Sequence, residues 1–502
     1  MNTKYIFNPF YSLRNDIKRV LLCNSSVFKV PLNIAEDEIL SLIHPVFAIV
    51  FSFFNGQISL KDNLTKISNM FNLPKDDAYN FIKPFLENEK RVGIEYDNNF
   101  FEFPKLILLD NSKFDFPIRK LDPINYFIEG KLDFETYRLY NDPSSLSLLV
   151  NTLCATDCIY CYVDRKIKTG CKIPFARLKE LIEEAKNIGV VNFDISGTEI
   201  FLYKHWADLI AELLKNGYYP YLSTKIPLDE NNIIKLKKIG INNLQLSIDT
   251  VIEKEAKIVN RIKKIEGYFD KMYKTLRNLE IHGFNVVVNV VLTRYNCSEN
   301  GILQLLTKLS EFSNIEKVTL NPAEISLGCS SKEFDDFKNS TIEIKIIESL
   351  INKTKQKFKF NLALAGYLEK SDLDGDFDTK KEKYNKRSLC SANNYQMCIL
   401  NDGNVTICEE LYWNENFIIG NVLTHSIKEI WQSDKAIKLA SLKRDDFSDK
   451  SLCKTCYSFE NCRLGKGVCW SNVIAAYGKE NWDFPSPECP YAPKPYFSMH
   501  HD

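Results

Sequence analysis

The sequence has no excess of charge of either sign and no apolar run long enough to cross a membrane. Lys and Arg together number 65, as do Asp and Glu, so the formal net charge is zero. This balance gives no electrostatic reason to expect nucleic acid or an anionic membrane as a partner. The longest apolar stretch, residues 40–54, falls short of the roughly 20 residues of a spanning helix. It also contains His44 and Pro45, so we expect a buried helix there.

A secretion signal is also missing, because residues 1–16 do not show a charged segment followed by an apolar one. Fifteen cysteines without such a signal indicate a reducing, cytoplasmic location, where closely spaced cysteines are more often metal ligands than disulfides. The cysteines are unevenly distributed. Only Cys23 precedes Cys154, and eight lie between Cys390 and Cys489.

The length of 502 residues predicts two to four domains. Residues 1–115 are predicted to form a small α/β unit. In it, two amphipathic helices follow a turn at Gly56, and residues 92–109 resemble a two-stranded wing. Residues 116–144 are predicted to be a linker.

Residues 145–330 alternate between apolar strands and amphipathic helices. Six strands with intervening helices predict a parallel sheet by the right-handed crossover rule, and hence a partial (β/α)6 barrel of the TIM type. Functional groups are then expected at the carboxyl ends of the strands. Residues 331–387 are charged and predicted to be a bridging region, and residues 388–495 form a cysteine-rich domain.

The segment "NTLCATDCIYC" places Cys154, Cys158 and Cys161 directly after the first strand of this series, followed by Tyr162. A structural zinc site takes four ligands and disulfides need an even number of thiols. Three thiolates suit three irons of a 4Fe–4S cluster, whose fourth iron is left for an external ligand. Zinc completed by a distant His or Asp is the alternative.

The three cysteines and the aromatic residue after them resemble the signature of the radical S-adenosylmethionine (SAM) enzymes. The resemblance implies that the amino and carboxylate groups of SAM bind the open iron. An electron from the cluster then cleaves the sulfonium and leaves a 5′-deoxyadenosyl radical.

The resemblance extends to "DISGTEIFL", which stands where the family has a Gly-Gly-Glu-Pro motif; Thr198 replaces the second Gly and Ile200 the Pro. It implies that Ser247 binds the ribose or carboxylate of SAM and that Leu292 packs against the adenine. Lys263 stands where the family usually has an Arg that binds the carboxylate of SAM, and Arg261 is the alternative cation. In the other interpretation, both residues belong to a solvated helix start and bind no cofactor. The residues expected to bind the cofactor are Tyr160, Tyr162, Gly197, Thr198, Glu199, Ser223, Ser247, Asp249, Lys263 and Leu292.

The cysteines after residue 388 resemble the SPASM extension of radical peptide-modifying enzymes, which implies two auxiliary 4Fe–4S clusters and three clusters in all. The first auxiliary set would be Cys390, Cys408 and Cys469 with Cys398 as fourth ligand, and the second Cys453, Cys456, Cys462 and Cys489. Six residues separate Cys462 from Cys469 where three are typical. The alternative is a pair of four-thiolate zinc knuckles.

Taken together, the chain resembles a radical SAM/SPASM maturase of a ribosomally made peptide. The implied activity is an oxidoreductase-type modification, with thioether formation of the sactipeptide or ranthipeptide kind expected first. The alternatives are carbon–carbon cross-linking, epimerisation, formylglycine formation on a sulfatase, and a non-catalytic iron–sulfur or zinc scaffold. The implied partners are a precursor peptide and an electron donor such as flavodoxin or ferredoxin. The N-terminal unit resembles winged-helix elements that bind leader peptides, although a dimerisation module would have the same pattern.

Overall fold

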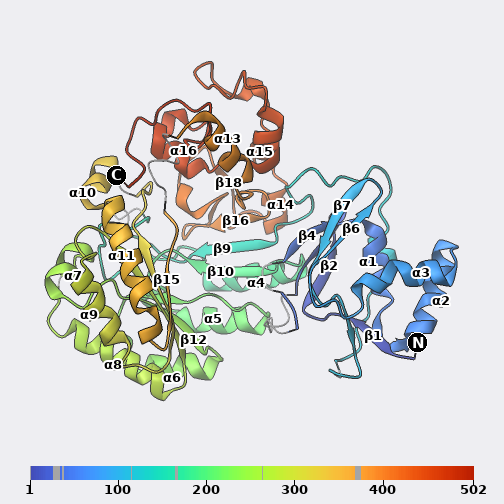
Figure 1. The fold of residues 1–502 in the computed structure, drawn as a ribbon, viewed down its shortest axis with the longest axis horizontal. Coiled ribbons are helices and arrows are strands. Elements are labelled where there is room, and N and C mark those ends of the chain that lie inside the picture. The colour runs from blue at the N-terminus through green and yellow to red at the C-terminus, as the bar shows by residue number, and fades with distance from the viewer. Residues whose placement is uncertain are drawn as a thin grey trace.

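The fold is described from a computed structural model over residues 2–25, 34–36, 39–114, 116–163, 168–262, 264–328, 330–367 and 375–501. Figure 1 shows three regions: an N-terminal unit at one end, a barrel at the other, and a cysteine-rich region beside the barrel. In this part of the chain no helix is both long and apolar enough to cross a membrane.

The N-terminal unit combines two three-stranded antiparallel sheets, a hairpin and three helices around one core. One sheet has the order β5-β1-β8, the other the order β2-β3-β4, and β6 pairs with β7. The strands are β1 (Lys4–Phe7), β2 (Tyr11–Asn15), β3 (Val20–Asn24), β4 (Leu40–Ile43), β5 (Asn55–Ser59), β6 (Val92–Tyr96), β7 (Asn99–Phe103) and β8 (Leu108–Asp110). The helices are α1 (Pro45–Ser52), α2 (Leu60–Phe71) and α3 (Lys75–Ile82). The two amphipathic helices and the wing hairpin were predicted, whereas β1 to β5 were not.

The apolar stretch 40–54 is not one buried helix, as predicted, but strand β4 followed by helix α1. His44 caps the helix: its backbone is extended, and its side-chain Nδ1 accepts a hydrogen bond from the Val46 N–H at 3.1 Å. Pro45 then occupies the first helical position, where its missing N–H is not needed. Hydropathy alone could not separate the two elements, because both are apolar.

The barrel contains the six predicted strands and a seventh. Strands β11 to β15 form one parallel sheet in chain order, and β10 pairs in parallel with β9. The strands are β9 (Ser145–Leu149), β10 (Asn192–Ser196), β11 (Ser223–Thr224), β12 (Asn243–Ser247), β13 (Asn285–Leu292), β14 (Ile315–Pro322) and β15 (Asn361–Leu364). The seventh strand, β15, lies in the segment expected to be only a charged bridge.

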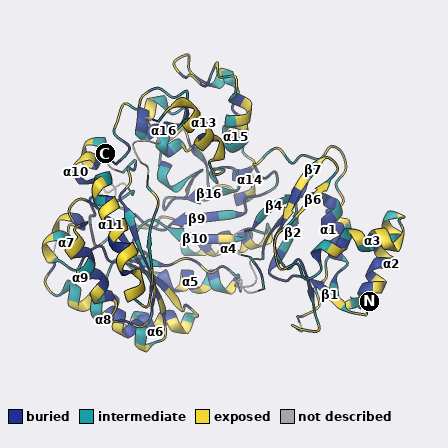
Figure 2. Cartoon of the chain, in the orientation of Figure 1, coloured by how far each residue is buried: buried dark blue, intermediate teal, exposed yellow. Residues whose placement is uncertain are grey.

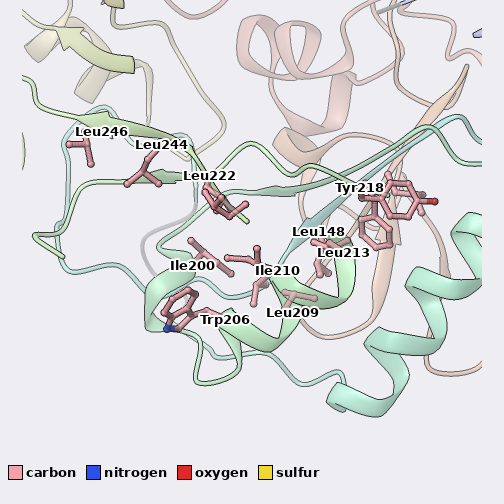
Figure 3. Packing of buried hydrophobic residues seen from close by; sticks show 14 of the residues in the cluster. Leu148, Ile200, Trp206, Leu209, Ile210, Leu213, Tyr218, Leu222, Leu244 and Leu246 are labelled. Atoms are coloured by element: carbon pink, nitrogen blue, oxygen red, sulfur yellow. The ribbon is translucent and has the colours of Figure 1, made fainter. Parts of the chain in front are cut away.

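Amphipathic helices cover the outer side of the strands, as the exposed outer faces in Figure 2 show. They are α4 (Phe175–Asn187), α5 (Trp206–Lys215), α6 (Glu230–Ile239), α8 (Tyr268–Ile281), α9 (Glu299–Leu309) and α11 (Thr341–Thr354). Two shorter helices, α7 (Glu253–Val259) and α10 (Ser331–Phe337), pack outside this core. Apolar side chains of α5, such as Ile210 and Leu213, meet strand residues such as Leu148 in the core (Figure 3). This packing fixes the strand ends that carry the site.

The cysteine-rich region is joined to the barrel by main-chain pairing. Strand β16 (Gln396–Ile399) runs parallel to β9 and extends its sheet through the antiparallel strands β17 (Asn404–Thr406) and β18 (Ile418–Asn421). The helices of this region are α13 (Phe377–Lys386), α14 (Ile427–Trp431), α15 (Asp434–Ala440) and α16 (Trp470–Tyr477). Because the two regions share one sheet, their cysteine sets are held in a fixed relation.

Candidate active site

A cavity of about 640 Å³ opens at the carboxyl ends of the barrel strands, a size typical of small-molecule and cofactor sites. Its wall includes all three cysteines of the first motif. The other predicted residues that line it are Tyr160, Tyr162, Gly197, Thr198, Glu199, Ser223 and Ser247.

The cysteine loop is held from one side by the end of α7. The N–H of Asp157 donates to the carbonyl of Asn260 at 3.0 Å, and the N–H of Ile159 donates to the carbonyl of Val259 at 2.9 Å. Within the loop, the N–H of Cys161 donates to the carbonyl of Cys158 at 3.2 Å. The loop between Cys154 and Cys161 therefore has a defined path although it is neither helix nor strand.

Two further elements hold the end of the loop. Gly328 lies so close that a Cβ there would be 2.6 Å from the carbonyl oxygen of Tyr162, so only glycine fits without a shift. The Tyr412 hydroxyl donates to the same carbonyl at 2.7 Å. The barrel and the cysteine-rich region thus both position Cys161.

The turn after β10 approaches the cysteine loop closely. Gly197 has φ +92°, a left-handed conformation that favours glycine, and a Cβ there would lie 1.9 Å from Leu149 Cδ1 and force that side chain to move. The Thr198 hydroxyl contacts the Asn151 side-chain oxygen at 2.7 Å, and the Asn151 amide donates to the Glu199 carbonyl at 3.2 Å. Thr198 therefore fastens this turn to the segment that precedes Cys154.

Glu199 connects β10 to β11. Its carboxylate accepts hydrogen bonds from the Thr224 hydroxyl at 2.8 Å and from the N–H groups of Lys225 and Phe201 at 3.2 and 3.3 Å. Burial raises the pKa of Glu199 to about 7, although these hydrogen bonds act in the opposite direction. The residue is only 3% exposed, so its main visible role is to fix the strand ends.

Asp249 is the centre of a buried polar network behind the cysteines. Its carboxylate accepts from the Lys225 ammonium at 2.6 Å, from the Tyr160 hydroxyl at 2.5 Å and from the Val291 N–H at 2.9 Å. It also accepts from the Asn260 amide. Burial lowers the pKa of Lys225, but the charges of Asp249 and Cys158 outweigh it and leave this pKa above its usual value. Lys225 therefore carries a positive charge at the cavity wall.

The structure departs from the predictions at two of the cofactor positions. Leu292 is fully buried in the core, and its neighbour Val291 lines the cavity instead, because alternate residues of a strand point to opposite faces. Asp249 is 2% exposed and lies behind the wall. Lys263 is outside the described residues, and the alternative cation, Arg261, pairs with Asp157 at 3.5 Å.

Sequence reasoning missed Lys225 and Asn260. The signal for Lys225 was a cation directly after the short strand β11, which ends at Thr224. No sequence pattern indicated a role for Asn260, because this residue reaches the site only through the packing of α7 against the cysteine loop.

In the first auxiliary set, the thiols of Cys390, Cys408 and Cys469 lie near one another and near the Glu410 carboxylate. Burial raises the pKa of Cys408, and the charges of Glu410, Cys469 and Cys390 raise it further. Cys469 is exposed, and the charges of Cys390 and Glu410 raise the pKa of its thiol. Glu410 itself accepts a hydrogen bond from the Ser471 hydroxyl at 2.5 Å.

Cys398, the predicted fourth ligand of that set, has a different setting. It lies fully buried on β16 opposite Ser147 of β9. Burial raises its pKa to about 12, although the neighbouring Ser147 and Ser196 hydroxyls act in the opposite direction. The thiol packs in a small apolar cluster with Leu149, Leu400 and Tyr412.

The second auxiliary set brings all four predicted cysteines around one small space of about 30 Å³; they are Cys453, Cys456, Cys462 and Cys489. Arg463 donates to Cys453 Sγ at 3.2 Å, and Arg387 donates to Cys462 Sγ at 3.3 Å. The Tyr384 hydroxyl lies 3.3 Å from Cys462 Sγ. Cationic donors of this kind stabilise thiolates.

The donor sets fit iron–sulfur clusters by their chemistry, because thiolate is the ligand that such clusters take. In the part of the chain that the structure describes, no three His, Cys, Asp or Glu side chains converge closely enough for a single metal ion. In a 4Fe–4S cubane each thiolate binds a different iron, so its sulfurs surround a cluster rather than one ion.

The fold and the site define a protein with a cysteine-lined cavity in a partial barrel and a second, cysteine-rich domain on the same sheet. Residues 148–305 match the model of the radical SAM superfamily, and residues 390–457 match that of the SPASM iron–sulfur cluster-binding domain. The chain therefore contains a radical SAM domain and a SPASM domain, and the predicted resemblance to proteins that combine these two domains is confirmed.

Similar proteins agree with this class. A PqqA peptide cyclase of Granulibacter bethesdensis is 28% identical over 156 residues, which are 31% of this chain and 41% of that protein. The chain thus spans about two fifths of the length of this curated relative. SuiB of Streptococcus suis bound to its precursor peptide SuiA matches with TM-score 0.57 and 14% identity over 96% of this chain and 98% of SuiB. SuiB bound to S-adenosylmethionine matches with TM-score 0.58, 14% identity, and coverage of 96% and 99%. At this identity the likeness to SuiB establishes the fold, and the predicted α/β architecture is confirmed.

Proposed function

We propose that the protein is a radical SAM enzyme that modifies a ribosomally made precursor peptide, with a thioether between a Cys sulfur and a carbon as the expected product. The observation that carries the proposal is the loop of three cysteines in the wall of an open cavity at the strand ends. The names of two similar proteins support a peptide substrate: one is a peptide cyclase and the other was solved with its precursor peptide.

Cys154, Cys158 and Cys161 would hold the 4Fe–4S cluster and leave one iron for SAM. When bound, the cluster and SAM together would supply a 5′-deoxyadenosyl radical that removes a hydrogen atom from the peptide. The chain contributes the polar wall at Thr198 and Ser247, which orients the cofactor, and walls that keep water from the radical.

Glu324, on the loop after β14, is placed to accept a proton from the peptide. It lines the same cavity as the three cysteines. Partial burial, together with the nearby Glu410 and Glu488, raises the pKa of this carboxyl. A thioether forms with loss of the thiol proton, so a carboxylate of raised pKa near the reacting sulfur suits the reaction.

The SPASM region would hold the two auxiliary clusters, three clusters in all, and receive the electron released when the cross-link forms. An external low-potential carrier such as flavodoxin or ferredoxin would exchange that electron. The Glu410 carboxyl lies between the cavity and the first auxiliary set, since it lines the cavity and affects the thiols of Cys408 and Cys469. The substrate is therefore expected to react on that side.

Residues 1–115 would form the leader-binding domain, 145–330 the barrel and 388–495 the auxiliary-cluster domain. We propose that the leader extends the sheet of the β6–β7 hairpin, a common mode of peptide recognition. An enzyme that forms formylglycine on a sulfatase has no need of leader docking, so the N-terminal unit favours peptide maturation. We expect the protein to act in the cytoplasm, without nucleic acid or a membrane as partner.

Anaerobic reconstitution with reductant and SAM tests the proposal. Release of 5′-deoxyadenosine is expected, and a co-expressed Cys-rich precursor should lose two hydrogens per thioether, measured by mass spectrometry. An unchanged peptide mass with released 5′-deoxyadenosine would favour epimerisation. No release at all would contradict the enzyme assignment and favour a scaffold.

A further inference from the structure

Asn260 connects the cysteine loop to the buried network around Asp249. It ends helix α7 and is 5% exposed. Its side-chain amide donates to Cys158 Sγ at 3.5 Å and also to the Asp249 carboxylate. A primary amide has two N–H groups, so one can serve the sulfur and the other the carboxylate.

The amide is held in this orientation by a buried ion pair. The Lys225 ammonium lies 2.6 Å from Asp249 Oδ2, with side chains 13% and 0% exposed. The Val291 N–H donates to Asp249 Oδ1 at 2.9 Å. Asp249 therefore cannot turn away from Asn260 without losing the ion pair and a main-chain hydrogen bond at once.

We propose that Asn260 is a positioning residue that sets the reduction potential of the cluster bound at Cys158, through an N–H···S hydrogen bond held in place by the Asp249–Lys225 pair. The inference rests on the proposed function only in that the three cysteines must bind an iron–sulfur cluster. Asn260 is not among the residues expected to contact SAM, and Asp249, which was, lies behind the cavity wall.

The physical reason is the charge that builds up on reduction. One electron passes from the reductant to the oxidised cluster, and no bond is formed or broken. Hydrogen bonds to the cysteine sulfurs stabilise the extra negative charge and raise the potential. Thr156 offers a second donor: its hydroxyl lies 3.3 Å from Cys154 Sγ and 3.4 Å from Cys158 Sγ. With a single proton, this hydroxyl can donate to only one of the two thiolates.

A structural role and an electronic role of Asn260 can be separated. The loop is held by the backbone carbonyls of Asn260 and Val259, which side-chain substitutions leave in place. Asn260→Leu keeps the approximate shape of the side chain and removes both N–H donors. The matched control is Asn296→Leu, because Asn296 is equally buried and donates to the Asp249 and Val291 carbonyls at 2.9 Å, not to sulfur.

The experiment is an EPR-monitored redox titration of the reconstituted full-length chain without SAM or peptide. The signal that Cys158→Ala abolishes is assigned to the cluster at this loop. We expect Asn260→Leu to move the midpoint of that signal to a more negative potential, with the iron content and the other signals unchanged. Asn296→Leu should leave the midpoint where it is. An unchanged midpoint in Asn260→Leu at full iron content overturns the inference.

A second measurement decides the case if Asn260→Leu loses iron. In deuterated buffer, pulsed EPR of the reduced wild-type cluster should show an exchangeable deuteron that is weaker in Asn260→Ala. No exchangeable coupling in the wild type, or the same coupling in Asn260→Ala, overturns the inference. A wild-type chain that binds no cluster at Cys158 contradicts the proposed function instead, so the two failures are distinguishable.

Discussion

The cysteine loop of the barrel and the second auxiliary set differ in how many thiols they bring together. Three thiols, Cys154, Cys158 and Cys161, border a cavity of about 640 Å³. In the second set four thiols surround a space of about 30 Å³, and three of them, Cys456, Cys462 and Cys489, also border an outer cavity of about 990 Å³. Metal sites that bind substrate keep an open position, and structural or electron-transfer sites close theirs with protein ligands. The number of thiols, not the free volume, is therefore the basis on which we propose chemistry at the first site and electron transfer at the second.

The largest expected effect is at the open site. Cys158→Ala should abolish release of 5′-deoxyadenosine and reduce the iron content from about twelve to about eight per chain. Anaerobic iron analysis and chromatography of the nucleoside check both values. Leader-peptide binding should persist, and its loss together with activity would point to misfolding rather than to a missing ligand.

The buried ion pair beside the open site should contribute more to stability than any surface pair. Lys225→Met leaves the Asp249 carboxylate, which is fully buried, without its cation. Removing one partner of a buried pair costs about 3–5 kcal/mol. Urea denaturation of the metal-free chain measures the loss. The double variant Lys225→Met, Asp249→Asn should recover part of it, and no recovery would contradict the pairing.

The close contact at Gly328 should matter next. In Gly328→Ala the new Cβ would meet the Tyr162 carbonyl at 2.6 Å, so the end of the cysteine loop must shift. Overpacking of this kind costs about 1–3 kcal/mol. We expect weaker iron binding at the loop and less SAM cleavage, with the second auxiliary set intact. Gly170→Ala is the control, because a Cβ at Gly170 meets nothing within 4 Å. Equal iron loss in both variants would contradict the account.

The smallest effect concerns pH at the open site. Burial raises the pKa of Glu199 to about 7, so the folded chain holds this proton more tightly than the unfolded one. Its contribution to stability is therefore complete below the unfolded pKa of about 4.5 and is lost as the pH rises through about 7. The stability difference between wild type and Glu199→Gln should fall by about 2 kcal/mol from pH 5 to pH 8 in urea denaturation. A difference independent of pH would contradict the raised pKa.

Local sequence patterns predicted the parts of the molecule that depend on local spacing. Strand and helix periodicity predicted β9 to β14, and cysteine spacing predicted both the open loop and the four-thiol set. Strand β15 was missed because its segment is charged around a short apolar core, and β4 because it runs directly into an apolar helix.

Side-chain direction and long-range contact were harder to predict. Leu292 belongs to a correctly located strand but faces the core, because a shift of one residue reverses the face of a strand. Cys398 lies on β16, a strand that was not predicted, and is fully buried opposite Ser147 of β9. Lys225 and Asn260 meet Asp249 from separate elements, and only the packing of the barrel brings them together.

The most direct test of the open iron is the EPR spectrum of the reduced, reconstituted chain with and without SAM. The account predicts that SAM changes the signal of one cluster, and that this signal and its change are both absent in Cys158→Ala. If SAM alters no cluster signal, or if the loop is found to hold zinc or a cluster closed by a fourth protein ligand, the central assignment is wrong.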